Sequence, residues 1–120
     1  MDIRNAVIES TSLGDERCFM FWLNLKYDKA IGQGYGGIVL DVPLKDEDGT
    51  FVRRVGTAFG CEAIMQVLRV VGVQRWEDLP GKHIRVEGGG IGSLGITRIG
   101  NILEDRWLDL KELAAEMGMD

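Results

Sequence analysis

The sequence predicts an α+β fold in one domain: a mainly antiparallel sheet of about six strands, one central helix and a C-terminal helix. Segments with alternating apolar residues lie on both sides of a single long segment with helical spacing. Strands and helices do not alternate regularly, which argues against a parallel sheet. The length of 120 residues, 45% of them hydrophobic and 28% charged, suits one globular domain spanning residues 1–120.

The first third of the chain is predicted to form three strands. Residues 3–10 are mostly apolar and β-branched, and residues 12–15 resemble a turn. Residues 18–27 alternate apolar and polar side chains, as a half-buried strand does. The glycine-rich residues 32–40 form the third strand, which we expect to end at Pro43 because proline cannot donate to a ladder.

A hairpin and a helix are predicted next. Residues 45–49 form a solvated turn and residues 50–52 a short edge strand. Residues 57–71 have helical spacing, and Gly72 suits the left-handed residue that ends a helix. The apolar stripe expected to face the core is Cys61, Ile64, Met65, Leu68 and Val71.

The last third is predicted to contain two strands and a closing helix. Residues 76–79 form a helical turn, residues 82–87 a strand, and residues 94–103 another strand. Asp109 is expected to cap a helix that ends near Met117. Ile84 and Val86 are expected to point inward. The intervening glycine run 88–93 lacks the following helix and lysine of a phosphate-binding loop, so a hairpin tip is expected.

Composition excludes several classes of function. The formal net charge of -5 opposes binding of long nucleic acid, although a few arginines can still hold a small anion. Cys18 and Cys61 lack metal-ligand spacing, so buried free thiols and no metal site are expected. No apolar segment reaches membrane-spanning length and the start of the chain lacks a signal-peptide core, which predicts a cytoplasmic protein without membrane contact.

Catalysis is not expected, and neither is a cofactor. Hydrolytic enzymes need a nucleophile with a base in hydrogen-bond reach, and His83 is the single histidine. It falls on the outward side of its predicted strand, beside Arg85 and Glu87, where a solvated histidine is the expected outcome.

The most informative feature is the run Gln33, Gly34, Tyr35 and Gly36, which should be a strand but carries few side chains. Glycine in a strand marks a bulge, a bend or a close approach to the backbone. An amide, a phenol and open main chain together suit a small polar, aromatic ligand. A strongly curved strand over a core is an equally good interpretation.

Arginines and aromatic residues form a second set of candidates. Arg54 precedes the central helix, whose free N–H groups favour an anion. Arg98 and Asn101 lie on the penultimate strand. Phe59 and Trp107, like Tyr35, can stack on a base. Phe59 and Trp107 can equally be core or interface residues, and the arginines can be solvated.

Five motifs carry a resemblance to small phage and prophage proteins. They are residues 3–6 (IRNA), 10–14 (STSLG), 32–37 (GQGYGG), 76–82 (WEDLPGK) and 99–105 (IGNILED). Together they span nearly the whole chain and resemble the first family of Thoeris anti-defence proteins. The run 88–92 departs from this pattern.

The resemblance implies a sponge, which binds the glycocyclic ADP-ribose signal of bacterial TIR-domain enzymes without cleaving it. Some members also bind cyclic di- or trinucleotides at a separate site between subunits. It further implies a homo-oligomer, a dimer or a hexamer, with ligand sites near subunit contacts. On this interpretation the ligand contacts are Gln33, Gly34, Tyr35 and Gly36, with Phe59 and Trp107 stacking on adenine and Arg54, Arg98 and Asn101 on phosphate and ribose.

Two other functions stay open from the sequence. Residues 79–86 can form a barrel strand of a single-stranded nucleic-acid binder, which the net acidity opposes. A small hydrolase that degrades a cyclic nucleotide is the other alternative.

Overall fold

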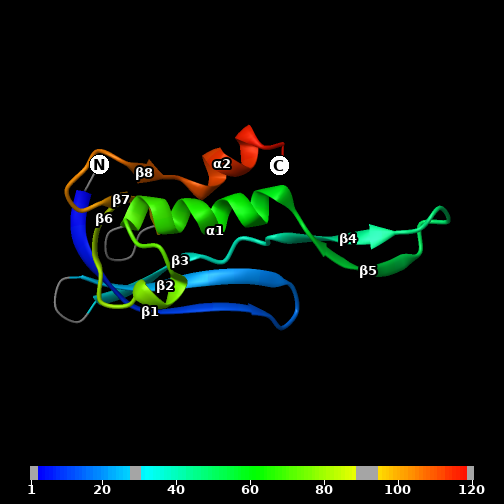
Figure 1. Cartoon of the computed structure of the whole chain (residues 1–120), viewed down its shortest axis with the longest axis horizontal. Coiled ribbons are helices and arrows are strands. Elements are labelled where there is room, and N and C mark those ends of the chain that lie inside the picture. The colour runs from blue at the N-terminus through cyan, green and yellow to red at the C-terminus, as the bar shows by residue number, and fades with distance from the viewer. Residues whose placement is uncertain (1–2, 28–30, 89–94, 119–120) are drawn as a thin grey trace.

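The computed structural model describes residues 3–27, 31–88 and 95–118, and it confirms the predicted α+β fold (Figure 1). Within those residues the chain forms eight strands, two α-helices and one short 3-10 helix. In chain order they are β1 (Ile3–Asp15), β2 (Phe19–Tyr27), β3 (Ile31–Gly36), β4 (Asp41–Lys45), β5 (Phe51–Gly56), α1 (Ala58–Val71), η1 (Trp76–Asp78), β6 (His83–Gly88), β7 (Ile96–Asn101), β8 (Trp107–Leu108) and α2 (Leu110–Glu116).

Six strands form an antiparallel main sheet in the order β3-β2-β1-β6-β7-β8. β1 continues through residues 12–15, so the turn predicted there is wrong. These residues stay in the strand because each pairs with β2, as far as Asp15 opposite Phe19. A register shift between Ile8 and Ser10 forms a β-bulge, which lets β1 bend while its pairing with β2 continues.

The sheet curls until its two edge strands approach each other. β3 and β8 lie at opposite edges, yet the hydroxyl of Tyr35 on β3 donates a 3.0 Å hydrogen bond to the carbonyl of Leu108 on β8. The same hydroxyl accepts a 3.1 Å hydrogen bond from the N–H of Leu110, at the start of α2. The accumulated twist of neighbouring strands produces such a curl. One face of the sheet thus becomes a concave apolar surface.

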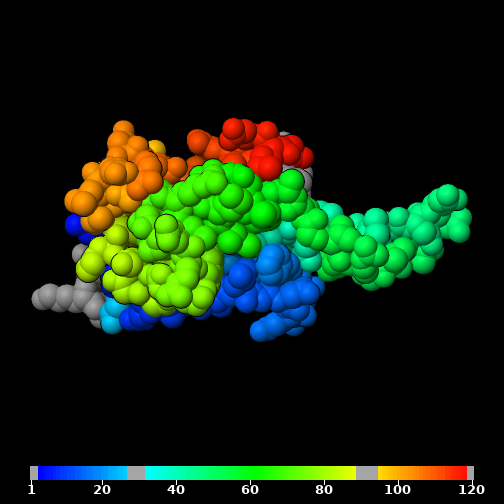
Figure 2. Space-filling view, viewed as in Figure 1, coloured from blue at the N-terminus to red at the C-terminus, as the bar shows by residue number. Residues whose placement is uncertain are grey.

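Helix α1 lies inside this curl, with β1, β2 and β3 on one side and β8 with α2 on the other (Figure 1). Figure 2 shows α1 and the segment that follows it covering part of the main sheet in this view. Residues from every strand of the main sheet and from both α-helices meet there. The buried apolar residues are Ala6, Ile8, Phe21, Leu23, Leu25, Tyr35, Leu40, Phe59, Ala63, Val67, Val70, Leu79, Ile84, Val86, Ile99, Leu108, Leu110 and Ala114.

The bounds of α1 agree with the prediction, and its core-facing residues agree in part. Thr57 caps the helix by accepting the N–H of Gly60 at 2.8 Å, and Gly72 ends it at a φ of 93°. The buried face carries Phe59, Gly60, Ala63, Val67 and Val70. Of the predicted stripe, Ile64, Leu68 and Val71 pack against this core while partly buried, whereas Cys61 and Met65 are exposed. Small residues are needed on the inner face because a Cβ on Gly60 would overlap the carbonyl of Leu40. Cys61 is therefore not the buried thiol that was expected.

β4 and β5 form a two-stranded ribbon that projects from the body as an arm (Figures 1 and 2). Two predictions fail here. The glycine-rich strand ends at Gly36, and Pro43 lies inside β4 instead of ending it. Proline fits because each strand of a two-stranded ribbon leaves one edge unpaired. The predicted strand 50–52 is longer, so Arg54 lies within β5 and not at the start of the helix.

The C-terminal third follows the prediction closely. Ile84 and Val86 of β6 are buried, and His83 is exposed. Asp109 caps α2, with its carboxylate accepting the N–H groups of Lys111 and Glu112. The two-residue strand β8 was not predicted. The predicted hairpin tip lies outside the described residues after Gly88.

Candidate functional site

A hollow of about 510 Å³ lies beside the glycine-rich strand β3. Its walls come from the end of β3 and the residues after it, from the start of β7, and from the start of α2. It is lined by Gly34, Tyr35, Gly36, Gly37, Ile38, Gly95, Ile96, Thr97, Leu110 and Lys111. We call it the β3 hollow. Because β3 and α2 meet only through the curl of the sheet, the hollow exists only in the folded chain.

The wall formed by β3 is mainly backbone. Among the described strands β3 pairs only with β2, so alternate residues turn their N–H and C=O groups away from the sheet. Gly36 and Gly37 have φ angles of 121° and 68°, which L side chains rarely adopt. A Cβ on Gly36 would also lie 2.5 Å from the carbonyl oxygen of Phe21. Glycine is therefore required here to turn the chain out of the sheet.

The opposite face of β3 explains Gly34 and gives a second reason for Gly37. The indole of Trp22, on β2, covers Gly34 and Gly37. A Cβ on Gly34 would lie 2.9 Å from Cε3 of Trp22, and one on Gly37 would overlap its six-membered ring. The bared strand thus serves two purposes, because it admits Trp22 on one face and borders the hollow on the other.

Tyr35 forms a buried part of the hollow wall. Its side chain is 5% exposed and its hydroxyl makes the two hydrogen bonds that join β3 to Leu108 and Leu110. Burial raises the pKa of the phenol, and the hydrogen bond from the Leu110 N–H opposes that rise in part. The ring is fixed in the core, so stacking on a base is not the role that this position supports.

The charged group of the hollow is Lys111, which the sequence analysis missed. Its side chain is exposed at the wall, and among the described residues it has no ion pair. The amide nitrogen of Gln33 lies nearby, 3.4 Å from the position that a Cβ on Gly95 would take. Nothing in the local sequence distinguishes Lys111 from other helix lysines, because its position depends on the curl of the sheet.

Arg54 lies at the base of the arm, where its guanidinium is bound to Asp41 on β4. Nε and Nη2 each donate to one carboxylate oxygen at 2.9 Å, and Asp41 also accepts the N–H of Phe19. The hydrogen bonds from Arg54 lower the pKa of Asp41, and they raise the pKa of Arg54. This pair fastens the arm to β2, so the predicted phosphate contact is not supported.

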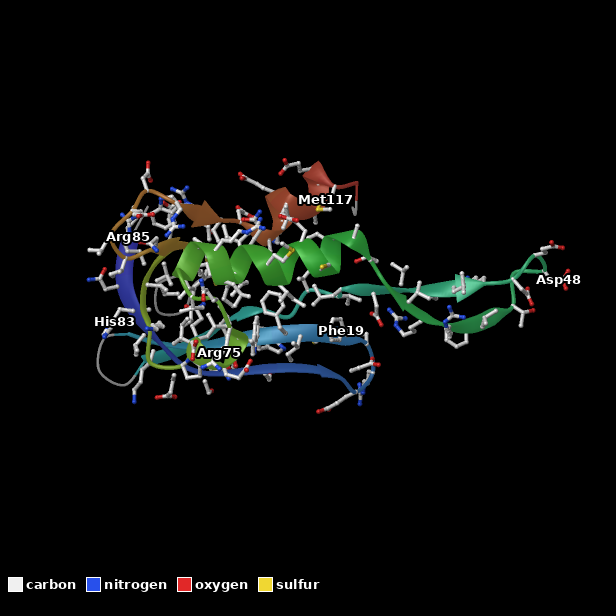
Figure 3. All side chains as sticks on the ribbon, viewed as in Figure 1. Phe19, Asp48, Arg75, His83, Arg85 and Met117 are labelled. Carbon is white, nitrogen blue, oxygen red and sulfur yellow. The ribbon has the colours of Figure 1, made fainter. Side chains whose placement is uncertain are left out.

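Arg98 and Trp107 belong to a separate cluster on the outer face of the sheet. Arg98 donates two hydrogen bonds to Glu87, and its guanidinium carbon lies 4.2 Å from the centre of the Trp107 ring. Arg85 lies 4.7 Å from the same ring centre. Figure 3 shows Arg85 at one end of the molecule and Asp48, at the tip of the arm, at the other. In this cluster Arg98 is paired with Glu87, and both arginines lie against the ring of Trp107.

Phe59 and Asn101 are also structural. Phe59 is 2% exposed, within the core face of α1. Asn101 is 7% exposed, and it donates to the carbonyl of Val70 at the end of α1 while accepting the N–H groups of Leu103 and Glu104. Both are too enclosed for the predicted stacking and ribose contacts. Of the predicted site residues, the hollow brings together Gly34, Tyr35 and Gly36, with Gln33 nearby, and not the others.

Comparison of the chain with protein-family models, with curated protein sequences and with solved structures finds no match. In the part of the chain that the structure describes, no three histidine, cysteine or acidic side chains gather as a metal site would require. None of the described helices is both long enough and apolar enough to span a membrane.

Proposed function

We propose that this protein binds a compact cyclic nucleotide of the cyclic ADP-ribose class in the β3 hollow and holds it without cleaving it. One observation carries the proposal: the glycine-bared strand borders a hollow and is not packed shut against the helix. The volume of about 510 Å³ falls within the range of roughly 300–1,000 Å³ that is usual for small-ligand sites. The resemblance to Thoeris anti-defence proteins favours the same ligand.

The chemistry of the walls suits such a ligand. Unpaired main-chain groups of β3 can donate to and accept from ribose hydroxyls and phosphate oxygens. Lys111 supplies a positive charge for the pyrophosphate. The apolar side chains of Ile38, Ile96 and Leu110 offer a surface for the adenine ring. A compact cyclic molecule presents these three kinds of group close together.

The walls also favour retention over hydrolysis. Among the described lining residues there is no carboxylate, imidazole or thiol. The hydroxyl of Tyr35 is engaged in two hydrogen bonds, and Thr97 has no carboxylate or imidazole base among these lining residues, where the amine of Lys111 is assigned to the pyrophosphate. General base and nucleophilic catalysis both need such a pair. This composition supports sequestration over the hydrolase alternative.

The arm supports the proposal of a homo-oligomer, a dimer or a hexamer. Phe51 is 57% exposed and Val52 51%, on a two-stranded ribbon of a kind that is marginally stable alone. Burying these side chains against a second copy would stabilise the arm. We expect Phe51→Ser to reduce the mass measured by light scattering after gel filtration. Leu103→Ser, at a side chain that is 90% exposed on the body, should leave the mass unchanged.

Thermal unfolding tests the ligand. A ligand that binds only the folded state stabilises it by about 2.7 kcal/mol at 100 times its dissociation constant, so cyclic ADP-ribose isomers should raise the Tm. Lys111→Ala should weaken the shift, because the pyrophosphate loses its cation. Lys82→Ala is the matched control, since Lys82 is also exposed and also lacks an ion pair among the described residues. An unchanged Tm with every isomer would contradict the proposal.

A further inference from the structure

The outer face of the sheet carries a groove that the β3 hollow does not include. It lies where β1 turns into β2, and its volume is about 370 Å³. It is lined by Ser12, Leu13, Gly14, Glu16, Arg17, Cys18, Met20 and Trp22. We call it the Trp22 groove. The cross-strand pairs Ser12 with Trp22 and Gly14 with Met20 place its floor on the face opposite the core.

Trp22 is presented in this groove as an open aromatic face. The ring rests on Gly34 and Gly37, which have no side chains to lift it from the strand. It is nevertheless 41% exposed, although a large apolar side chain is ordinarily covered. Among the described residues its indole N–H has no hydrogen-bond partner. The ring is held in place from below and is available from outside.

The rim of the groove supplies complementary polar groups. Arg17 is exposed and has no ion pair among the described residues, and Glu16 beside it is likewise unpaired. Met20 and Cys18 add polarisable sulfur next to the ring. A flat aromatic ring, a cation and a hydrogen-bond acceptor thus border one cavity of small-ligand size.

We propose that the Trp22 groove is a second binding site, which takes a purine base carried on a nucleotide. The base stacks on the open face of Trp22, as bases do on exposed aromatic side chains of sheets. Arg17 binds the phosphate, and Glu16 accepts a hydrogen bond from the exocyclic amine or a ribose hydroxyl. This proposal does not rest on the one made for the hollow, because the two cavities share no lining residue.

Binding of AMP and of adenosine to the full chain, followed by isothermal calorimetry, tests this site. Trp22→Ala should weaken AMP binding about tenfold or more, since stacking on one aromatic ring is worth about 1–3 kcal/mol per base. Arg17→Ala should remove the preference for AMP over adenosine. Arg53→Ala is its control, because Arg53 is exposed on the arm and also lacks an ion pair among the described residues.

A groove-filling variant separates binding from folding. A Cβ on Gly14 would have no atom within 4 Å and its φ is not in the left-handed region, so Gly14→Leu should fold normally and occupy the groove. Gly56→Leu, at an equally open glycine on the arm, is the matched control. AMP should bind the control as it binds the unmodified chain, and bind Gly14→Leu at least tenfold more weakly.

Two results would overturn the proposal: no binding of AMP by the unmodified chain at millimolar concentration, or binding of AMP by Trp22→Ala and Gly14→Leu that is as tight as binding by the unmodified chain. Lys111→Ala distinguishes the two sites, because it should weaken the ligand of the hollow and leave AMP binding unchanged. If the unmodified chain binds AMP but no cyclic ADP-ribose isomer, the proposal for the hollow fails and the one for the Trp22 groove stands.

Discussion

Two tryptophans on the outer face of the sheet use the same packing arrangement with opposite outcomes. Trp107 covers Gly100 of the neighbouring strand, where a Cβ would lie 2.6 Å from the ring. The guanidinium groups of Arg85 and Arg98 flank it, and its N–H donates to Asp105. Trp22 also lies over glycines, but within residues 3–27, 31–88 and 95–118 no guanidinium flanks its ring and no side chain accepts its N–H.

The difference is the basis of our proposal that one arrangement serves structure at Trp107 and recognition at Trp22. At β8 the protein supplies both the cations and the acceptor that an indole can use, so the ring and the N–H of Trp107 are both engaged within the protein. At β2 the ring of Trp22 is positioned and 41% exposed, and none of the side chains that the structure describes accepts its N–H. The strand whose glycines lie under Trp22, β3, also forms a wall of the β3 hollow. Glycine at β3 therefore makes two surfaces available at once.

The largest expected loss of stability comes from adding a side chain at Gly37, on which the ring of Trp22 rests. Gly37→Ala places a Cβ inside the Trp22 ring at a φ of 68° and should destabilise the fold by about 2–5 kcal/mol. Gly49→Ala is the control, because Gly49 has a φ of 81° with no atom near its Cβ position. It should cost only the backbone strain, about 1 kcal/mol. Urea unfolding measures both, and equal losses would mean that Trp22 does not rest on Gly37.

A second pair of variants compares the two tryptophans directly. Gly100→Ala should cost about 1–3 kcal/mol, because Trp107 is held between its partners and cannot move away. Gly34→Ala should cost less, since its Cβ would lie 2.9 Å from the Trp22 ring and alanine gains about 0.5–1 kcal/mol over glycine within a strand. Urea unfolding of the two variants tests this order. A larger loss for Gly34→Ala would show that Trp22 is the more constrained ring.

Replacing Tyr35 should cause a smaller loss of stability, and the size of that loss should depend on pH. Tyr35→Phe leaves the Leu110 N–H and the Leu108 carbonyl without their partner and should cost about 1–3 kcal/mol near neutral pH. Burial raises the pKa of Tyr35, so its neutral form is favoured by folding. Its contribution is complete below the unfolded pKa of about 10 and is lost as the pH rises above it.

Denaturation at pH 8 and at pH 11 checks whether the contribution of Tyr35 to stability falls as the pH rises. The unmodified chain should lose more stability between the two pH values than Tyr35→Phe does. Parallel losses in the two proteins would indicate that the phenol is not buried in the folded state, and the link between β3 and β8 would then be wrong.

Much of the fold follows from local patterns in the sequence. Alternation places Ile84 and Val86 inside, and capping chemistry locates Gly72 and Asp109, because each depends on near neighbours in the chain. The predicted buried face of α1 was right for Ile64, Leu68 and Val71 but wrong for Cys61 and Met65, because the helix turns smaller residues such as Gly60 and Ala63 to the core, where they allow closer packing. Sequence periodicity reports hydrophobicity, not the distance between backbones.

The residues of the candidate site at the β3 hollow were predictable only in part. The glycine run located β3 and the hollow, since absent side chains are visible in a sequence. Lys111 was missed because the curl that brings α2 to β3 is a long-range property. Arg54 and Arg98 looked free because their partners, Asp41 and Glu87, lie on other strands. A pairing between strands cannot be read from either segment alone.

Release of bound ligand tests the function most directly. The protein is incubated with a cyclic ADP-ribose isomer, separated from free ligand by gel filtration, denatured by heat, and the supernatant analysed by mass spectrometry. We predict recovery of the intact cyclic molecule in proportion to the protein, and much less from Lys111→Ala. Recovery of a linear product, or of no ligand from any isomer, would contradict sequestration in the β3 hollow.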